Sequence, residues 1–217
     1  QHASVCIEEY ATIFLTGRVL FTNGTTFKIG KGVTFKADVT SETFVVIDQG
    51  AKIDAQGTAD APIVFTSSNP VGSRGDQDWG GIIINGNAKS NMYETGIQVG
   101  EKFYCGDNDD DNSGILNYVR IEFAGKLIAA TMELDGLQLQ CVGRQTKVEY
   151  IQTHFGSDDG IEVAGGTVNL KYIVSTGNLD DQFDSTYGWR GNIQFLAAAT
   201  IGHGDEGLEW DNNCDNM

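Results

Sequence analysis

Residues 135–212 contain one short motif four times at nearly constant spacing. Each copy begins with an acidic residue and continues with alternating side chains, at 135–139, 159–163, 181–185 and 206–210; the second residues, at 136, 160, 182 and 207, lie 24, 22 and 25 positions apart. A period in this range indicates a solenoid. The copies are rich in β-branched and aromatic residues and are bounded by Gly, Asn and Asp, which is typical of strands and turns. We therefore predict an all-β, single-domain parallel β-helix with coils roughly 4.8 Å apart.

Strand alternation predicts which side chains of the motif point away from the core. The outward column, which we call the acidic ladder, contains Gln138, Glu162, Asp184 and Glu209. The preceding turns carry a second acidic column at 158–159, 180–181 and 205–206. Like charges about 5 Å apart cost roughly 3 kcal/mol at an effective dielectric near 20. Solvent exposure, raised carboxyl pKa values or a bound cation could each offset this repulsion.

A second register of aromatic residues runs between the copies of the motif. Tyr118, Tyr150, Tyr172 and Phe195 are expected at one point on the coil. Stacked aromatic side chains inside the helix or at its corner are the interpretation that we favour. An outward aromatic column would instead form a platform for sugar rings.

Composition limits the partners and the compartment. The formal net charge of −16 argues against nucleic acid and anionic membrane surfaces, which both require basic patches. We find no apolar run near 18 residues and expect no transmembrane segment. The expected partners are other copies of the chain, other surface proteins or a polysaccharide.

The cysteine pattern favours a secreted protein. Cys6, Cys105, Cys141 and Cys214 are widely spaced and form no CxxC pair. We predict two disulfides, with the pairing open, in an extracellular or cell-surface protein; four buried free thiols are the alternative. No targeting segment is visible at the start of the sequence. Asn23 begins an N-glycosylation sequon, which matters only in a eukaryotic secretory route.

Several segments resemble known β-helix proteins. These are GRVLFTNGTTFKIGKGVTFKA at 17–37, IDQGAKIDAQGTADAPIVFTS at 47–67 and DWGGIIINGNA at 78–88. They resemble right-handed parallel β-helix proteins of the pectin-lyase-like superfamily, and within it a group of uncharacterised secreted bacterial surface proteins and lipoproteins. The resemblance runs from about Gly17 to Trp210. It implies the fold, but this fold hosts lyases, hydrolases, adhesins and structural fibres alike.

The expected organisation is an N-terminal cap at 1–16 and a β-helix at 17–217, interrupted by an insertion at about 85–114. The insertion ends in an acidic run in which Asp107, Asp109, Asp111 and Ser113 have the alternating oxygen spacing of calcium loops. It is not an EF-hand, because Asn112 replaces the loop glycine and the twelfth position is Tyr118. We predict a Ca²⁺ site here, with a solvated acidic turn as the alternative.

The same fold includes polygalacturonase-type hydrolases, and part of their motif order recurs here. Asp159, the Asp180–Asp181 pair and His203 follow one another about one coil apart, and Arg190 is a basic residue near the acidic columns. Two carboxylates and a histidine would suit inverting glycoside hydrolysis. However, Gly-Ser-Asp-Asp replaces the Asn-Thr-Asp of those enzymes, and their Arg-x-Lys motif is absent.

We therefore predict a non-catalytic structural or adhesive module of the cell surface. We expect calcium and disulfides to stabilise it, and we expect copies to stack into a filament. The alternative is a carbohydrate-active enzyme, either a hydrolase or a lyase, that acts on an acidic polysaccharide.

Overall fold

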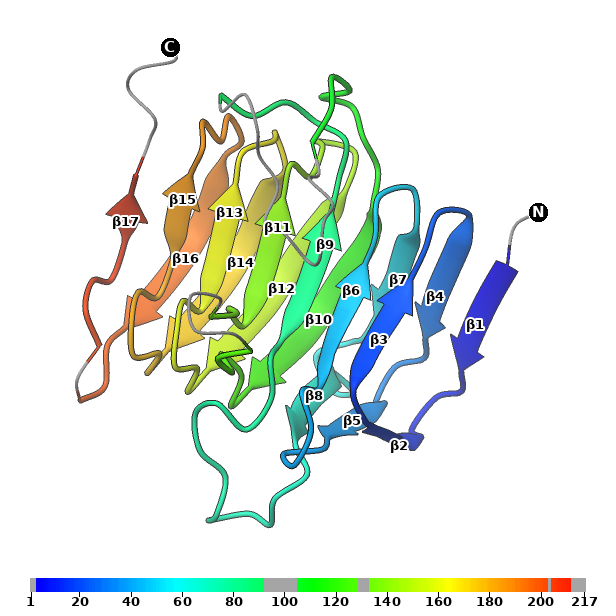
Figure 1. Ribbon diagram of the computed structural model, residues 1–217, viewed down its shortest axis with the longest axis vertical. Helices are drawn as coiled ribbons and strands as arrows, with labels where there is room; N and C mark the ends of the chain where they lie inside the picture. The colour runs from blue at the N-terminus through cyan, green and yellow to red at the C-terminus, as the bar shows by residue number, and fades with distance from the viewer. Residues whose placement is uncertain (1–2, 92–104, 129–132, 203, 212–217) are drawn as a thin grey trace.

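The computed structural model describes residues 3–91, 105–128, 133–202 and 204–211. Within these ranges the chain forms strands and turns and no helix, and the strands pair in parallel. No helix of the described chain is therefore long and apolar enough to span a membrane. The strands return to the same positions coil after coil and build one elongated stack (Figure 1). The predicted all-β parallel β-helix is confirmed.

The first three coils contribute three strands each. In chain order they are β1 (Ala3–Ile7), β2 (Thr12–Leu15), β3 (Arg18–Phe21), β4 (Thr25–Ile29), β5 (Thr34–Ala37), β6 (Phe44–Ile47), β7 (Lys52–Gln56), β8 (Ile63–Ser67) and β9 (Ile82–Asn85). The segment expected as a cap forms β1 and β2, which pair in parallel with β4 and β5. Residues 3–15 therefore belong, together with β3, to the first coil of the stack.

The last four coils contribute two strands each, the first of which is long. They are β10 (Gly114–Glu122), β11 (Leu137–Gln140), β12 (Lys147–His154), β13 (Ile161–Ala164), β14 (Asn169–Thr176), β15 (Asp184–Thr186), β16 (Ile193–Ala199) and β17 (Glu209–Trp210). β10 pairs with both β7 and β8, so one long strand takes the place of two. Each long strand bends at a residue with left-handed φ, namely Tyr118, Tyr150, Tyr172 or Phe195.

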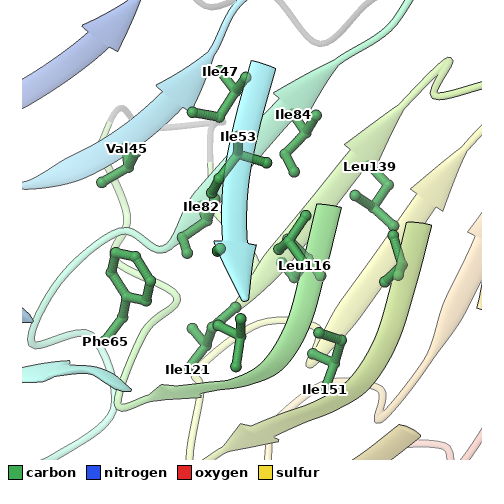
Figure 2. Close-up of a cluster of buried hydrophobic side chains, with 14 of the residues drawn as sticks. Val45, Ile47, Ile53, Phe65, Ile82, Ile84, Leu116, Ile121, Leu139 and Ile151 are labelled. Carbon is green, nitrogen blue, oxygen red and sulfur yellow. The ribbon is translucent and has the colours of Figure 1, made fainter. Parts of the chain in front are cut away.

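Seven short strands, one from each coil, form a separate sheet in the order β17-β15-β13-β11-β9-β6-β3. The inward side chains of this sheet stack in register: Val45 lies beside Ile82, and Ile82 beside Leu137. Figure 2 shows Val45 and Ile82 of this sheet in one core with Ile53, Leu116 and Ile121 of the opposite walls. Burying one such side chain contributes roughly 1.5–3 kcal/mol, so the stacked core is the main source of stability.

The last described coil leaves its apolar residues exposed. Leu208 and Trp210, which strand alternation assigns to the core, are 43% and 55% exposed, whereas Phe183 one coil earlier is fully buried. The difference arises because no described coil lies beyond β17.

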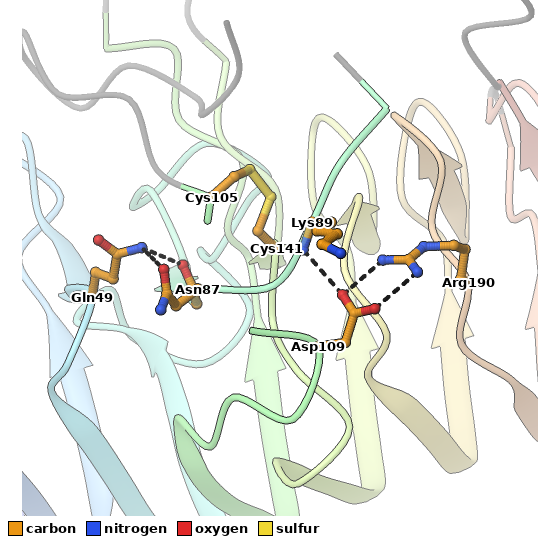
Figure 3. Close-up of a disulfide and its surroundings, with 8 residues drawn as sticks. Gln49, Asn87, Lys89, Cys105, Asp109, Cys141 and Arg190 are labelled. Atoms are coloured by element: carbon orange, nitrogen blue, oxygen red, sulfur yellow. Dashed lines mark hydrogen bonds and ion pairs between the residues drawn. A yellow bond between two sulfur atoms is a disulfide. The ribbon is translucent and has the colours of Figure 1, made fainter. Parts of the chain in front are cut away.

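The insertion between β9 and β10 is fastened to the stack at several points (Figure 3). A disulfide joins Cys105 to Cys141 at the end of β11. Gln49 donates to the side chain of Asn87, and the backbone amide of Asn91 donates to the carbonyl of Tyr187. These contacts hold the described ends of the insertion across coils two to six.

Candidate functional site

The acidic ladder forms as the alternation predicts. Gln138 pairs with Glu162, Glu162 with Asp184, and Asp184 with Glu209 on consecutive strands of the seven-stranded sheet. Two of its members are nevertheless buried: Gln138 is 3% and Asp184 7% exposed. Solvent exposure therefore does not offset the repulsion that Asp184 experiences.

Part of the outer face of this sheet is covered by the chain that follows β10. Ile128 and Leu134 pack on an apolar cluster that Phe44, Val46 and Ile83 form on β6 and β9. Ile128 and Leu134 therefore cover this part of the sheet, and Asp135 follows directly after Leu134.

The acidic turns tie successive coils together. Oδ1 of Asp159 accepts the backbone N–H of Asp181 at 3.0 Å, and Oδ1 of Asp181 accepts that of Glu206 at 2.7 Å. The backbone amides of Gly136 and Gly160 in turn donate to the carbonyls of Asp159 and Asp181. Asp159 and Asp181 are 9% and 1% exposed. Each carboxyl thus accepts a backbone N–H group of the next coil.

A group of acidic side chains lies where the turns meet the ladder, and we call it the carboxyl cluster: Asp135, Asp158, Asp159, Glu162 and Asp184. One oxygen of each of Asp135, Asp158 and Asp159 lies within 4.8 Å of the others. Glu162 lies near enough for its charge to raise the pKa of Asp135, and its Oε2 accepts from Nε2 of Gln138 at 2.7 Å. Asp135 belonged to the predicted repeat but was not among the predicted site residues; its place directly before a repeat glycine, like that of Asp159, was the available signal.

Burial changes the protonation of this cluster. It raises the pKa of Asp158 to about 7 and the pKa of Asp159 to about 9, and neighbouring carboxylates add to both shifts. Burial, followed by the charge of Glu162, raises the pKa of Asp184 to about 7 and that of Asp135 well above its usual range. Burial also raises the pKa of Glu162. Protons therefore relieve part of the repulsion at neutral pH.

The predicted catalytic residues do not share one environment. Asp159 and Asp181 are buried in the turn ladder, whereas Asp180 is exposed. The charges that raise the pKa values of Asp159 and Asp180 all come from carboxylates. Arg190 is paired elsewhere, and His203 lies outside the described residues. Among the described residues, Asp159, Asp181 and Arg190 therefore do not meet in one open acid–base site.

The predicted calcium loop makes contacts within the protein (Figure 3). Both oxygens of Asp109 accept from the guanidinium of Arg190, at 2.8 and 2.9 Å. This hydrogen bonding holds the pKa of Asp109 at about 2. Asp111 accepts from the hydroxyl of Ser113, and Asp107 is exposed. A calcium ion at Asp109 would have to compete with an arginine.

The disulfide prediction is confirmed for one pair. Cys105 and Cys141 are bonded with their Cα atoms 5.1 Å apart, whereas Cys6 is a free, exposed thiol. Cys214 lies outside the described residues. Asn23 is exposed in the turn between β3 and β4, where a sequon is accessible.

The aromatic residues form an outward corner stack. Ring centroids are 4.2 Å apart for Tyr118 and Tyr150, 4.4 Å for Tyr150 and Tyr172, and 5.0 Å for Tyr172 and Phe195, with nearly parallel planes. A groove of about 650 Å³ runs beside them. Because each ring covers the face of the next, the stack presents mainly ring edges to the groove. A platform for sugar rings requires free ring faces, so this geometry favours the corner-stack interpretation.

Stacked parallel coils, an inward apolar column and acidic turns define a parallel β-helix protein of the pectate-lyase-like class. The chain belongs to the family of pectate-lyase-like β-helix domains, whose model matches residues 1–217. No curated protein and no solved structure matches the chain. Membership establishes the fold and leaves open whether the chain catalyses a reaction.

Proposed function

We propose that the chain is a non-catalytic structural or adhesive module of the cell surface, stabilised by its disulfide and by cations. The turn ladder carries this proposal. A general acid or base must reach its substrate, but Asp159 and Asp181 are buried and accept backbone N–H groups of the next coil. Their arrangement strengthens the stack and leaves them poorly placed to act on a polymer.

Two properties support an extracellular location. The Cys105–Cys141 disulfide is typical of proteins in oxidising compartments. A net charge of −16 favours solubility and attracts cations, which are abundant outside cells. Self-association into a filament is part of the same proposal.

A carbohydrate-active enzyme is the second candidate, and one observation favours it. Asp158 is only partly buried, and its pKa of about 7 lies in the range of a general acid or base at neutral pH. In a hydrolase or lyase, Asp158 would therefore be the carboxyl to test first.

The first experiment measures cleavage of uronic-acid polysaccharides between pH 5 and 9, with and without Ca²⁺. New reducing ends report hydrolysis, and ultraviolet absorbance of unsaturated products reports lyase activity. We expect neither. Cleavage by the wild type that is abolished in Asp158→Asn would overturn the non-catalytic proposal.

The second experiment is negative-stain electron microscopy with calcium and with a chelator. Filaments that separate into particles on chelation would support a cation-dependent assembly. Isolated particles under both conditions would remove self-association from the proposal.

A further inference from the structure

The carboxyl cluster has the spacing of a metal site. Asp135 comes before β11 in the fourth coil, and Asp158 and Asp159 come before β13 in the fifth. Their oxygens lie within 4.8 Å of one another. Because Ca²⁺ binds oxygens at about 2.3–2.6 Å, two ligands on opposite sides of one ion lie about 4.6–5.2 Å apart. All three oxygens can therefore reach a single calcium ion.

Two buried oxygens beside these carboxyls have no hydrogen-bond partner. One is Oε1 of Gln138, and the other is Oδ1 of Asp184; both residues are more than nine-tenths buried. The amide nitrogen of Gln138 donates to Glu162 at 2.7 Å, so the oxygen of the same amide also lies at the cluster. Buried acceptors nearly always have a partner, so two open acceptors here point to a bound cation or donor.

The charges around the cluster favour a cation over a neutral donor. Among the described residues, the charges that most strongly shift the pKa values of Asp135, Asp158, Asp159 and Asp184 come from carboxylates. The available ligands are all oxygens, which suit a hard ion rather than Zn²⁺ or Cu²⁺. Ca²⁺ accepts six to eight oxygens in a flexible geometry, whereas Mg²⁺ requires a near-ideal octahedron, so carboxyls supplied by separate turns favour Ca²⁺.

We propose that one calcium ion binds between the fourth and fifth coils, ligated by Asp135, Asp158 and Asp159 with the amide oxygen of Gln138 beside it. The ion clamps two turns whose carboxyls otherwise repel each other. This inference deepens the cation-stabilised structural function proposed above and locates its cation away from the acidic loop at 107–113. It concerns ion binding alone, so loss of the filament or discovery of an enzymatic activity would leave it standing.

Calorimetric titration of the chelator-treated chain with CaCl₂, together with thermal unfolding, tests the site. We expect one ion per chain and a Tm that rises by about 5–10 °C when calcium exceeds its Kd a hundredfold. Asp158→Asn removes a ligand that is only partly buried and should weaken calcium binding at least tenfold. Without calcium this variant should unfold at the same temperature as the wild type or higher, because it removes a repelling carboxyl.

Two control variants separate this site from its alternatives. Asp205 occupies the position of Asp158 two coils later and is exposed, so Asp205→Asn should bind calcium like the wild type. Asp107→Asn alters the acidic loop and should also bind normally. The inference fails if the wild type binds no calcium at millimolar concentration. It also fails if Asp158→Asn binds like the wild type, or if Asp107→Asn alone abolishes binding.

Discussion

The pair formed by Asp109 and Arg190 joins residues 81 positions apart and fastens the insertion to the sixth coil. Replacing Asp109 by Asn should lower the free energy of unfolding at pH 7. A carboxyl pKa held at about 2 instead of 3.8 corresponds to at most about 2.5 kcal/mol, at 1.36 kcal/mol per pKa unit. Arg190 is about half exposed, and exposed pairs contribute about 0–1 kcal/mol. We therefore expect a loss of about 1 kcal/mol.

The pH dependence of this loss follows from the direction of the pKa shift. Because the folded protein lowers the pKa of Asp109, the stabilisation is complete above about pH 4 and disappears as the pH falls toward 2. Urea unfolding of the wild type and Asp109→Asn, followed by tryptophan fluorescence at pH 7, 5 and 3, measures this difference. Arg190→Gln and the double variant complete a double-mutant cycle, whose coupling should also be about 1 kcal/mol.

Two results would refute this reasoning. One is a stability difference that stays the same from pH 7 to pH 2.5. The other is a coupling near zero between Asp109 and Arg190. Repeating the pH 7 measurement with calcium and with a chelator tests the calcium loop as well: if Asp109 binds calcium, the cost of Asp109→Asn should appear only when calcium is present.

Three further predictions concern the disulfide, the turns and the aromatic corner. Replacing Cys105 and Cys141 by Ser removes a link between residues 36 positions apart and should lower the free energy of unfolding by about 3–4 kcal/mol. A reductant should lower the Tm of the wild type and leave that of the double variant unchanged. A wild-type Tm that does not respond to the reductant would contradict this prediction. Gly160→Ala should lower the free energy of unfolding in urea by about 2–3 kcal/mol, because the added Cβ would collide with a buried polar network. Gly207 occupies the same repeat position in open space, so Gly207→Ala should change stability by less than about 0.5 kcal/mol. Equal effects of the two substitutions would rule out the collision. Tyr150→Ala and Tyr150→Gly both remove the stacked ring, but glycine adopts the left-handed φ of 54° without strain. The Gly variant should therefore be more stable than the Ala variant by about 0.5–1 kcal/mol in thermal unfolding. The reverse order would show that the backbone at this corner is unstrained.

Local sequence patterns predicted most of the coil. Alternation placed Leu137 and Ile161 inside and Glu162 and Asp184 outside, and the structure has them in the predicted register. These features are predictable because strand periodicity and turn chemistry act over a few residues, and a fixed repeat carries the same choice into each coil. The corner stack of Tyr150 and its neighbours follows from the same repeat.

Contacts between distant segments were decided only in the tertiary structure. The repeat does not encode the path of the insertion, so sequence reasoning could not pair Asp109 with Arg190 or choose the partner of Cys105. Nor could it show that Asp135 and Gln138 are buried. A carboxyl on a bare sheet face would be hydrated and ionised at neutral pH, but the same carboxyl in a buried cluster holds its proton or binds a cation. The sequence thus determined the coil and the position of each acidic residue along it. The packing of the non-repetitive segments determined which carboxyl groups are buried, and burial is what raises their pKa values.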